Sequence, residues 1–198
     1  MSVIVGIIHE GVVYLGSDSQ YTKGGTKKSN NHPNNRKIWH PDGRDQLLIG
    51  SAGLLKGINA IKSINGLIDQ ATLSQESLNY NYVVKNVARR IMDTMEEIKL
   101  IESKDYNPKM LNEFLFAYKN ELFMIGSDGS VLQIDDFSAI GSGSVEAIGS
   151  LLSTVNDDPK TRIIKAIEAA IQNDIYVGYP IIIMNTNNQN NDIIQEKE

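Results

Sequence analysis

The order of helical and extended segments constrains the fold of this chain more than any other sequence feature. Apolar residues recur at helical spacing over residues 54–68 and 79–102, and two further helical segments follow each other over residues 145–154 and 158–173. Short apolar runs typical of strands lie before, between and after these two pairs. Helices that come in pairs argue against a doubly wound parallel sheet, in which one helix follows each strand. The pattern therefore predicts an α+β fold of antiparallel sheets covered by helix layers.

Turn residues divide the extended parts of the sequence into hairpins. Residues 3–8 and 12–15 flank a Glu-Gly turn, and residues 114–118 and 122–125 flank a Lys-Asn-Glu turn. The first of these hairpins begins at the start of the chain, so the end of its second strand is expected to lie beside the N-terminus. The other strand candidates are residues 36–39, 46–52, 131–134, 137–140 and 179–184.

Segments of small and polar residues mark the expected loops. Lys, Gly, Ser and Asn fill residues 22–35, which predicts a loop, and Asn107-Pro108 ends the second helical segment. Asn, Gln and charged residues fill residues 187–198, which predicts a frayed C-terminal tail. We therefore expect one domain over residues 1–186, followed by a polar tail.

The composition excludes several classes of function. The net charge of -5 and the single, diluted cluster of basic residues argue against a nucleic-acid-binding protein, which usually carries a basic face. The absence of cysteine excludes disulfides, cysteine–zinc sites and thiol catalysis, and the three histidines lack metal-ligand spacing, so we expect neither a metal nor a cofactor. The sequence has no apolar run of about 20 residues and no signal-peptide pattern, which gives the cytoplasm as the default location.

Ser2 directly follows the initiator Met1, and a small second residue permits removal of that methionine. Ser2 would then carry both a hydroxyl group and a free α-amine, whose ordinary pKa of roughly 7.7–8.0 leaves it partly neutral near physiological pH. One residue would supply both a nucleophile and the base that activates it. Serine is also a common second residue, so this position alone decides nothing.

Five other residues are candidates for a site around Ser2. Asp18 ends the first hairpin, where a carboxylate could orient an amine, and Lys37 could lower the pKa of the α-amine. Backbone N–H groups near Gly50 lie where a strand passes into a helix and could bind an oxyanion. Ser142 could hydrogen-bond the amine. Asp174 lies against the unfavourable end of a helix dipole, which hints at a use. Each residue also has an ordinary structural explanation as a turn, cap or surface residue.

Taken together and in order, these positions resemble the proteasome β-type subunits, and more closely the bacterial HslV-type peptidases. The resemblance extends to about residue 186. Its strongest segments are residues 2–19, 36–38, 48–53, 139–144 and 166–174. It implies the four-layer αββα sandwich of the N-terminal-nucleophile hydrolases and a peptidase activity of the threonine-peptidase type.

The resemblance also implies a role for each candidate. Ser2 falls on the nucleophilic threonine of the family, and Asp18 and Lys37 fall on its catalytic Asp and Lys. Gly50 falls on the oxyanion-hole glycine, and Ser142 and Asp174 on the residues that hold the terminal amine. On the same mapping, the pocket for the side chain before the scissile bond is lined by Tyr21, Leu48 and Ala52. Such a pocket implies an apolar preference.

Two positions depart from the family. Ser2 lacks the β-methyl group of threonine that restricts χ1. Val177 replaces the hydroxyl residue that usually follows the second Asp of the family. Both departures are compatible with a subunit that has kept the fold and lost catalysis, and a small-molecule amidohydrolase or a plain binding module on this fold is a further alternative.

The resemblance extends to the partners. It implies a homo-oligomeric ring or stack that encloses the sites and acts on peptides or unfolded protein. It also leaves room for an ATP-driven unfoldase, of which the chain itself carries no signature.

Overall fold

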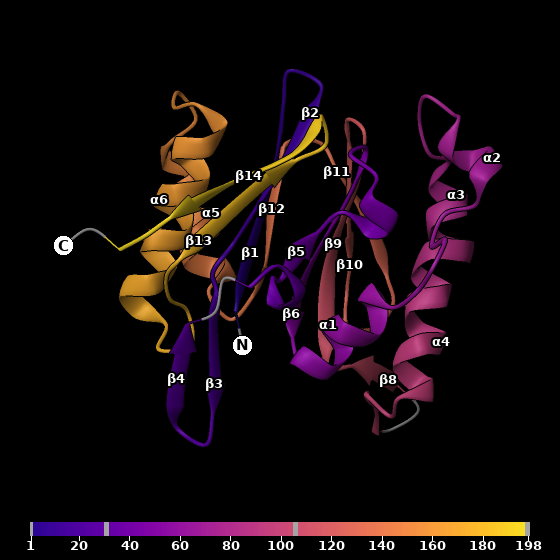
Figure 1. Cartoon of the computed structure of the whole chain (residues 1–198), viewed down its shortest axis with the longest axis horizontal. Helices are drawn as coiled ribbons and strands as arrows, with labels where there is room; N and C mark the ends of the chain where they lie inside the picture. The colour runs from indigo at the N-terminus through magenta and orange to yellow at the C-terminus, as the bar shows by residue number, and fades with distance from the viewer. Residues whose placement is uncertain (1, 30–31, 105–106, 197–198) are drawn as a thin grey trace.

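The computed structural model describes residues 2–29, 32–104 and 107–196, and Figure 1 shows them as two sheets packed face to face between two groups of helices. The first sheet has five antiparallel strands in the order β12-β1-β2-β13-β14. Its strands are β1 (Val3–His9), β2 (Val12–Ser17), β12 (Phe137–Gly141), β13 (Ile181–Asn185) and β14 (Asn188–Ile194).

The second sheet is also five-stranded and antiparallel, in the order β11-β10-β9-β6-β5. Its strands are β5 (Ile38–Trp39), β6 (Leu47–Gly53), β9 (Asn112–Tyr118), β10 (Glu121–Ile125) and β11 (Val131–Ile134). The short 3₁₀ turns η1 (Pro33–Asn35) and η2 (Pro41–Gly43) flank β5.

One group of helices covers the outer face of each sheet (Figure 1). The first sheet is covered by α5 (Ser144–Ser153) and α6 (Pro159–Asn173). On the second sheet lie α1 (Leu55–Lys62), α2 (Gln70–Leu73), α3 (Tyr80–Tyr82), the π-helical turn η3 (Val83–Ala88) and α4 (Arg89–Glu97). This arrangement confirms the expected α+β fold with four αββα layers.

Three apolar clusters lie between successive layers, and strand alternation explains how they form. In β1, Val3 and Val5 face α5 and α6, while Ile4 faces the second sheet. Both faces of this strand are therefore buried, which accounts for its continuous apolar sequence. Gly16 in β2 permits the close approach of α6, because a Cβ atom there would lie 2.1 Å from Ile163 Cγ2.

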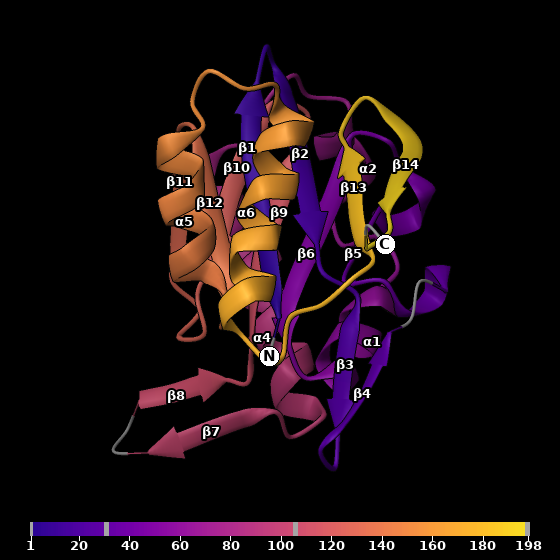
Figure 2. The ribbon, with the colours of Figure 1, turned by 90° about the vertical axis from the view of Figure 1, so that its left-hand side faces the viewer.

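The expected loop over residues 22–35 is wrong in its first half, where β3 (Gln20–Lys23) and β4 (Thr26–Ser29) form a hairpin. Its turn is Gly24-Gly25, both with positive φ, which is the pair of conformations that a tight hairpin turn requires. A second hairpin, of β7 (Ile101–Lys104) and β8 (Asn107–Met110), follows α4. Figure 2 shows both hairpins extending from the end of the sandwich at which the chain begins.

The prediction of a frayed tail from residue 187 is also wrong, because β14 pairs with β13 from Ile181↔Ile194 to Asn185↔Asn188. Polar residues suit this strand because it lies at the edge of its sheet. Lys160 of α6 further anchors it through an ion pair of 2.6 Å with Asp192.

Candidate active site

The first sheet brings three separate parts of the chain together at Ser2. Because β1 lies between β12 and β2, its first residues pair with the last residues of both neighbours, as Val3↔Gly141 and Ile4↔Ser17 show. The Ser2 side chain is only 1% exposed. The carbonyl oxygen of Ser2 accepts hydrogen bonds from Ser142 Oγ and from the backbone N–H of residue 143, each at 3.4 Å.

Gly141 allows this close approach of β12 to Ser2. Its φ of 94° is in the region that favours glycine, and a Cβ atom at this position would lie 2.2 Å from the Ser2 carbonyl oxygen. A side chain here would therefore displace either Ser2 or β12.

Asp18 follows β2 and is fully buried beside the start of β1. Its Oδ1 accepts hydrogen bonds from Lys37 Nζ at 2.8 Å and from Val3 N at 3.2 Å. Its Oδ2 accepts from Gln20 N at 3.1 Å and from Gly178 N at 3.3 Å. Four donors on one carboxylate stabilise its charged form and fix it next to Ser2.

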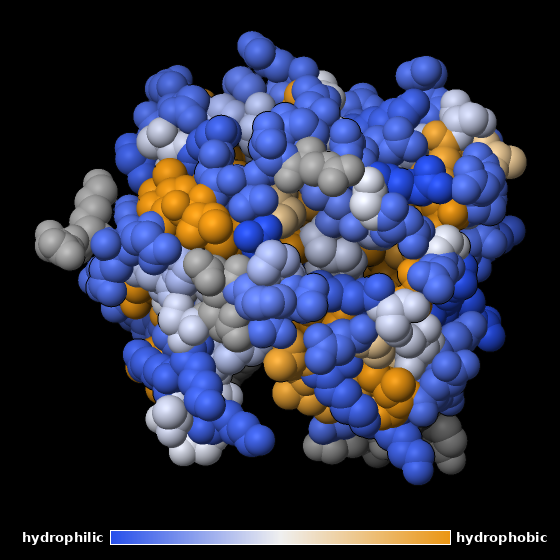
Figure 3. Space-filling model, in the orientation of Figure 1, coloured by the Kyte–Doolittle hydropathy of each residue, from blue (hydrophilic) through white to orange (hydrophobic). Residues whose placement is uncertain are grey.

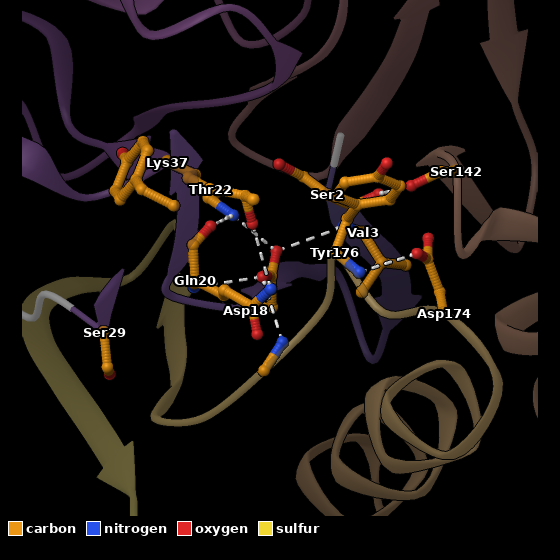
Figure 4. A network of polar contacts seen from close by, with 12 residues as sticks. Ser2, Val3, Asp18, Gln20, Thr22, Ser29, Lys37, Ser142, Asp174 and Tyr176 are labelled. Carbon is orange, nitrogen blue, oxygen red and sulfur yellow. Dashed lines mark hydrogen bonds and ion pairs between the residues drawn. The ribbon is translucent and has the colours of Figure 1, made fainter. Parts of the chain in front are cut away.

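Lys37 immediately precedes β5 and is 2% exposed. Its ammonium group donates to Asp18 Oδ1 and, at 2.7 Å, to the carbonyl oxygen of Gln20, and it lies 5.0 Å from the centre of the Tyr21 ring. Burial lowers the pKa of Lys37, and the charges of Asp18 and Asp174 oppose that shift. A buried, partnered cation therefore lies close to Ser2 (Figure 4).

Asp174 caps the C-terminal end of α6 on the other side of Ser2. Its Oδ1 accepts a hydrogen bond from Tyr176 N at 2.8 Å, whereas its Oδ2 is buried and has no hydrogen-bond partner among the described residues. A buried carboxylate oxygen without a donor is costly and uncommon in folded proteins. Figure 4 shows Asp174, Ser142 and Ser2 next to one another, although they come from three elements.

Two pockets open beside this cluster and share Gly53 and Leu54. The larger, of ≈ 630 Å³, is lined by Ser2 and by residues of the β3–β4 hairpin, among them Tyr21. The smaller, of ≈ 380 Å³, is lined by Ser142 and by residues at the ends of β6, β9 and β12. Ser2 therefore lies at the wall of the larger pocket.

The structure brings together Ser2, Asp18, Lys37, Ser142 and Asp174, but it does not bring Gly50 to them. Gly50 lies within β6, paired with Ile38 on one side and Leu115 on the other. A Cβ atom on Gly50 would lie 2.5 Å from Ile4 Cγ2, which places this residue in the interior between the sheets. Gly50 is therefore wrong as an oxyanion donor.

Gly53, which the sequence reasoning missed, is the glycine of β6 that lines both pockets. It has a φ of 132°, which a residue with a side chain rarely adopts. Gly53 is the last residue of β6, shortly before α1 begins, whereas Gly50 is three residues earlier. This position at the end of the strand is the signal that could have identified Gly53.

The expected pocket residues are only partly brought together. Tyr21 lines the larger pocket, and its hydroxyl donates to the carbonyl oxygen of Asn35. Ala52 lines the smaller pocket instead. Leu48 is fully buried in the cluster between the two sheets and is wrong as a pocket residue. Val177 is 2% exposed and packs in the cluster beneath α5 and α6.

Comparison with known proteins identifies the family of the chain. The family model described as "Proteasome subunit" matches residues 2–184, so the chain belongs to the proteasome subunit family. At the level of the family, it is a proteasome-type peptidase subunit with the N-terminal-nucleophile hydrolase fold. A search of the curated proteins finds no match.

Solved structures share the fold at low sequence identity. Thiobacillus denitrificans BPH in complex with epoxomicin has a TM-score of 0.68 and 16% identity, over 92% of this chain and 97% of its own. Anbu, the ancestral β-subunit, from Yersinia bercovieri has a TM-score of 0.69 and 16% identity, over 98% of this chain and 88% of its own. The eukaryotic HslV from Trypanosoma brucei has a TM-score of 0.60 and 19% identity, over 92% of this chain and 98% of its own. At these identities the likeness shows the fold alone.

Searches for a membrane span and for a metal site gave no candidate in the part of the chain that the structure describes. None of its helices there has the length and apolar character to cross a bilayer. Nor do three or more His, Asp or Glu side chains gather there in a way that could hold a metal ion.

Proposed function

We propose that this chain is a peptidase whose nucleophile is the hydroxyl group of Ser2, exposed by the removal of Met1. The observation that carries the proposal is the buried pair of Lys37 and Asp18, which is hydrogen-bonded to the backbone of Val3, directly after Ser2. Burying a lysine and a carboxylate is costly unless they are paired, and such a pair is weak evidence for stability alone. Its place beside the N-terminus therefore favours a chemical role.

The α-amine of Ser2 is the base in this proposal. An unperturbed α-amine has a pKa of roughly 7.7–8.0, and the nearby positive charge of Lys37 lowers that pKa, which favours the neutral amine that can act as a base. The buried Asp174 Oδ2 is an acceptor for an N–H of that amine, and Ser142 Oγ lies on the same side of Ser2. The two residues would hold the amine in place.

The reaction proceeds in two steps. Ser2 Oγ attacks the amide carbonyl carbon as its proton moves to the α-amine, and the resulting oxyanion forms near the backbone of Gly53. The C–N bond then breaks, the leaving amine takes the proton, and an ester to Ser2 remains. A water molecule, deprotonated by the α-amine, attacks this ester and releases the acid with the hydroxyl group restored.

The same proposal covers the assembly and the substrate class. We infer a homo-oligomeric ring or stack in the cytoplasm that acts on peptides or unfolded protein, with an ATP-driven unfoldase as its partner. The family membership supports this inference.

Hydrolysis of fluorogenic peptide amides tests the proposed nucleophile. The native chain should release the fluorophore, Ser2→Thr should stay within about tenfold of it, and Ser2→Ala should lose about a thousandfold or more in kcat. Ser153→Ala, which changes an exposed hydroxyl group on α5, is the matched control and should leave kcat unchanged.

Unchanged turnover in Ser2→Ala would refute the proposal. A native chain that assembles but cleaves nothing would instead support the catalytically inactive subunit, a reading that Val177 favours, because this buried side chain offers no hydroxyl group to the amine. Turnover of acyl amides without turnover of peptides would favour a small-molecule amidohydrolase.

A further inference from the structure

The larger pocket beside Ser2 is lined by two positively charged residues, Lys23 and Lys28. None of the described residues that line it is Asp or Glu. The one carboxylate that lines either pocket is Glu113, in the smaller one, where its Oε2 accepts from Gly141 N at 3.3 Å. The two sides of Gly53 therefore differ in charge.

The register of the β3–β4 hairpin places both lysines on the face of the hairpin that carries Tyr21, a residue that also lines this pocket. Tyr21 pairs directly with Lys28, and side chains that are opposite each other in an antiparallel pair lie on the same face. Lys23 is two residues beyond Tyr21 and so returns to that face. Lys27 is adjacent to Lys28, lies on the opposite face and does not line the pocket.

The ammonium groups of Lys23 and Lys28 take part in no ion pair with the described residues. Lys37, by contrast, is buried and bound to Asp18. Figure 3 shows the hairpin as a hydrophilic lobe with a hollow beside it, so charges on this lobe face a space that a ligand can enter. Two cations whose charge nothing nearby neutralises favour an anionic group in that space.

We propose that the pocket formed by Ser2, Lys23 and Lys28 binds an acidic side chain of the substrate, so that the enzyme cleaves beside Glu or Asp in preference to apolar residues. This inference rests on the proposed peptidase function and names its substrate class. It replaces the apolar preference expected from Tyr21, Leu48 and Ala52, since Leu48 and Ala52 do not line this pocket.

Paired fluorogenic peptides that differ only in Glu, Leu or Lys before the scissile bond test the preference. The native chain should have its highest kcat/KM with Glu. Because the two lysines are exposed, each should contribute about two- to fivefold, and Lys23→Gln/Lys28→Gln should lower the ratio of kcat/KM for Glu to kcat/KM for Leu by roughly tenfold. Added salt should weaken the preference of the native chain. Lys27→Gln removes the same charge from the other face and should change nothing.

A binding measurement separates this inference from the proposed function. Peptide acids ending in Glu or Gln, labelled at the other end, should bind Ser2→Ala with a Kd several times lower for Glu, and the double lysine variant should remove that difference. Peptidase activity with equal kcat/KM for the Glu and Leu reporters, or a preference that survives in the double variant, would overturn the pocket proposal alone. If the native chain cleaves no peptide, the binding difference still decides whether the pocket selects acidic chains.

Discussion

Replacing Lys37 by methionine should cost far more stability than replacing an exposed lysine. Methionine fills a similar volume but leaves the charge of Asp18 buried without its cation. Removing one partner of a buried ion pair typically costs about 3–5 kcal/mol. Asp18 would keep three backbone N–H donors, from Val3, Gln20 and Gly178, so we expect a loss near the lower limit, about 3 kcal/mol.

Urea denaturation followed by circular dichroism measures this loss. A folded domain is usually stable by about 5–15 kcal/mol, so Lys37→Met should still fold and unfold cooperatively, with a lower midpoint and an unchanged m-value. Lys165→Met is the matched control, because Lys165 pairs with Asp157 at 2.7 Å while half exposed. Its loss should be at most about 1 kcal/mol. Equal losses in the two variants would refute the account of the Lys37–Asp18 pair.

Three further changes test other parts of the account. Gly141→Ala should lower the free energy of unfolding by about 2–4 kcal/mol and abolish turnover by displacing Ser2. Gly66→Ala is its control, because Gly66 has a φ of 60° but a Cβ atom there would have no atom within 4 Å. It should cost about 1–2 kcal/mol and leave turnover intact. Burial lowers the pKa of Lys62 to about 8, so the unfolded state binds more protons between pH 8 and 10.5 and the free energy of unfolding should rise with pH there, with about 1–2 kcal/mol coming from Lys62. Lys62→Met should lose this contribution, while the lowered pKa of Lys37 leaves part of the rise. Thr186→Val should cost about 1–3 kcal/mol in urea denaturation, because the buried Thr186 Oγ1 binds two backbone groups, at 2.6 and 3.1 Å.

Each of these three predictions has an outcome that would contradict it. Equal effects of Gly141→Ala and Gly66→Ala would mean that the approach to the Ser2 carbonyl group is not tight. A rise in unfolding free energy with pH that is as large in Lys62→Met as in the native chain would assign this rise to another group. An unchanged midpoint in Thr186→Val would show that both backbone groups find other partners.

The sequence predicts those helices and strands in which the apolar residues recur at the period of the element and are the residues that it buries. The helix predicted over residues 158–173 is confirmed, because α6 runs over Pro159–Asn173. Asp158 caps it, its Oδ1 accepting hydrogen bonds from two backbone N–H groups. The pairing of the helices likewise predicted the layers, because each pair has one apolar face to bury. Polar strands escaped prediction, since β14 and the β3–β4 hairpin lack an apolar pattern and their formation depends on neighbours.

The candidate site could be predicted from a combination of positions that resembles a family, and it could not be predicted where only geometry distinguishes neighbouring residues. The first sheet brings Ser2, Asp18 and Ser142 together, while β5 of the second sheet places Lys37 and the end of α6 places Asp174 beside them. Gly50 already lies inside the strand predicted over residues 46–52, and only the backbone conformation and the pocket lining distinguish it from Gly53 at the end of β6.

The charge of the pocket depends on the register of the β3–β4 hairpin. A shift of one residue in that register would turn Lys28 away from the pocket and Lys27 toward it. The composition of residues 22–35 reveals the basic character of this segment but not which lysines face Ser2.

Intact-protein mass spectrometry after incubation with a peptide epoxyketone tests the central claim most directly. Probes of this class react with an N-terminal nucleophile. We expect a chain that lacks Met1 and gains the mass of one probe molecule, with no gain in Ser2→Ala. A chain that retains Met1 and stays unlabelled, or a Ser2→Ala variant that is labelled like the native chain, would contradict the assignment of Ser2 as the nucleophile.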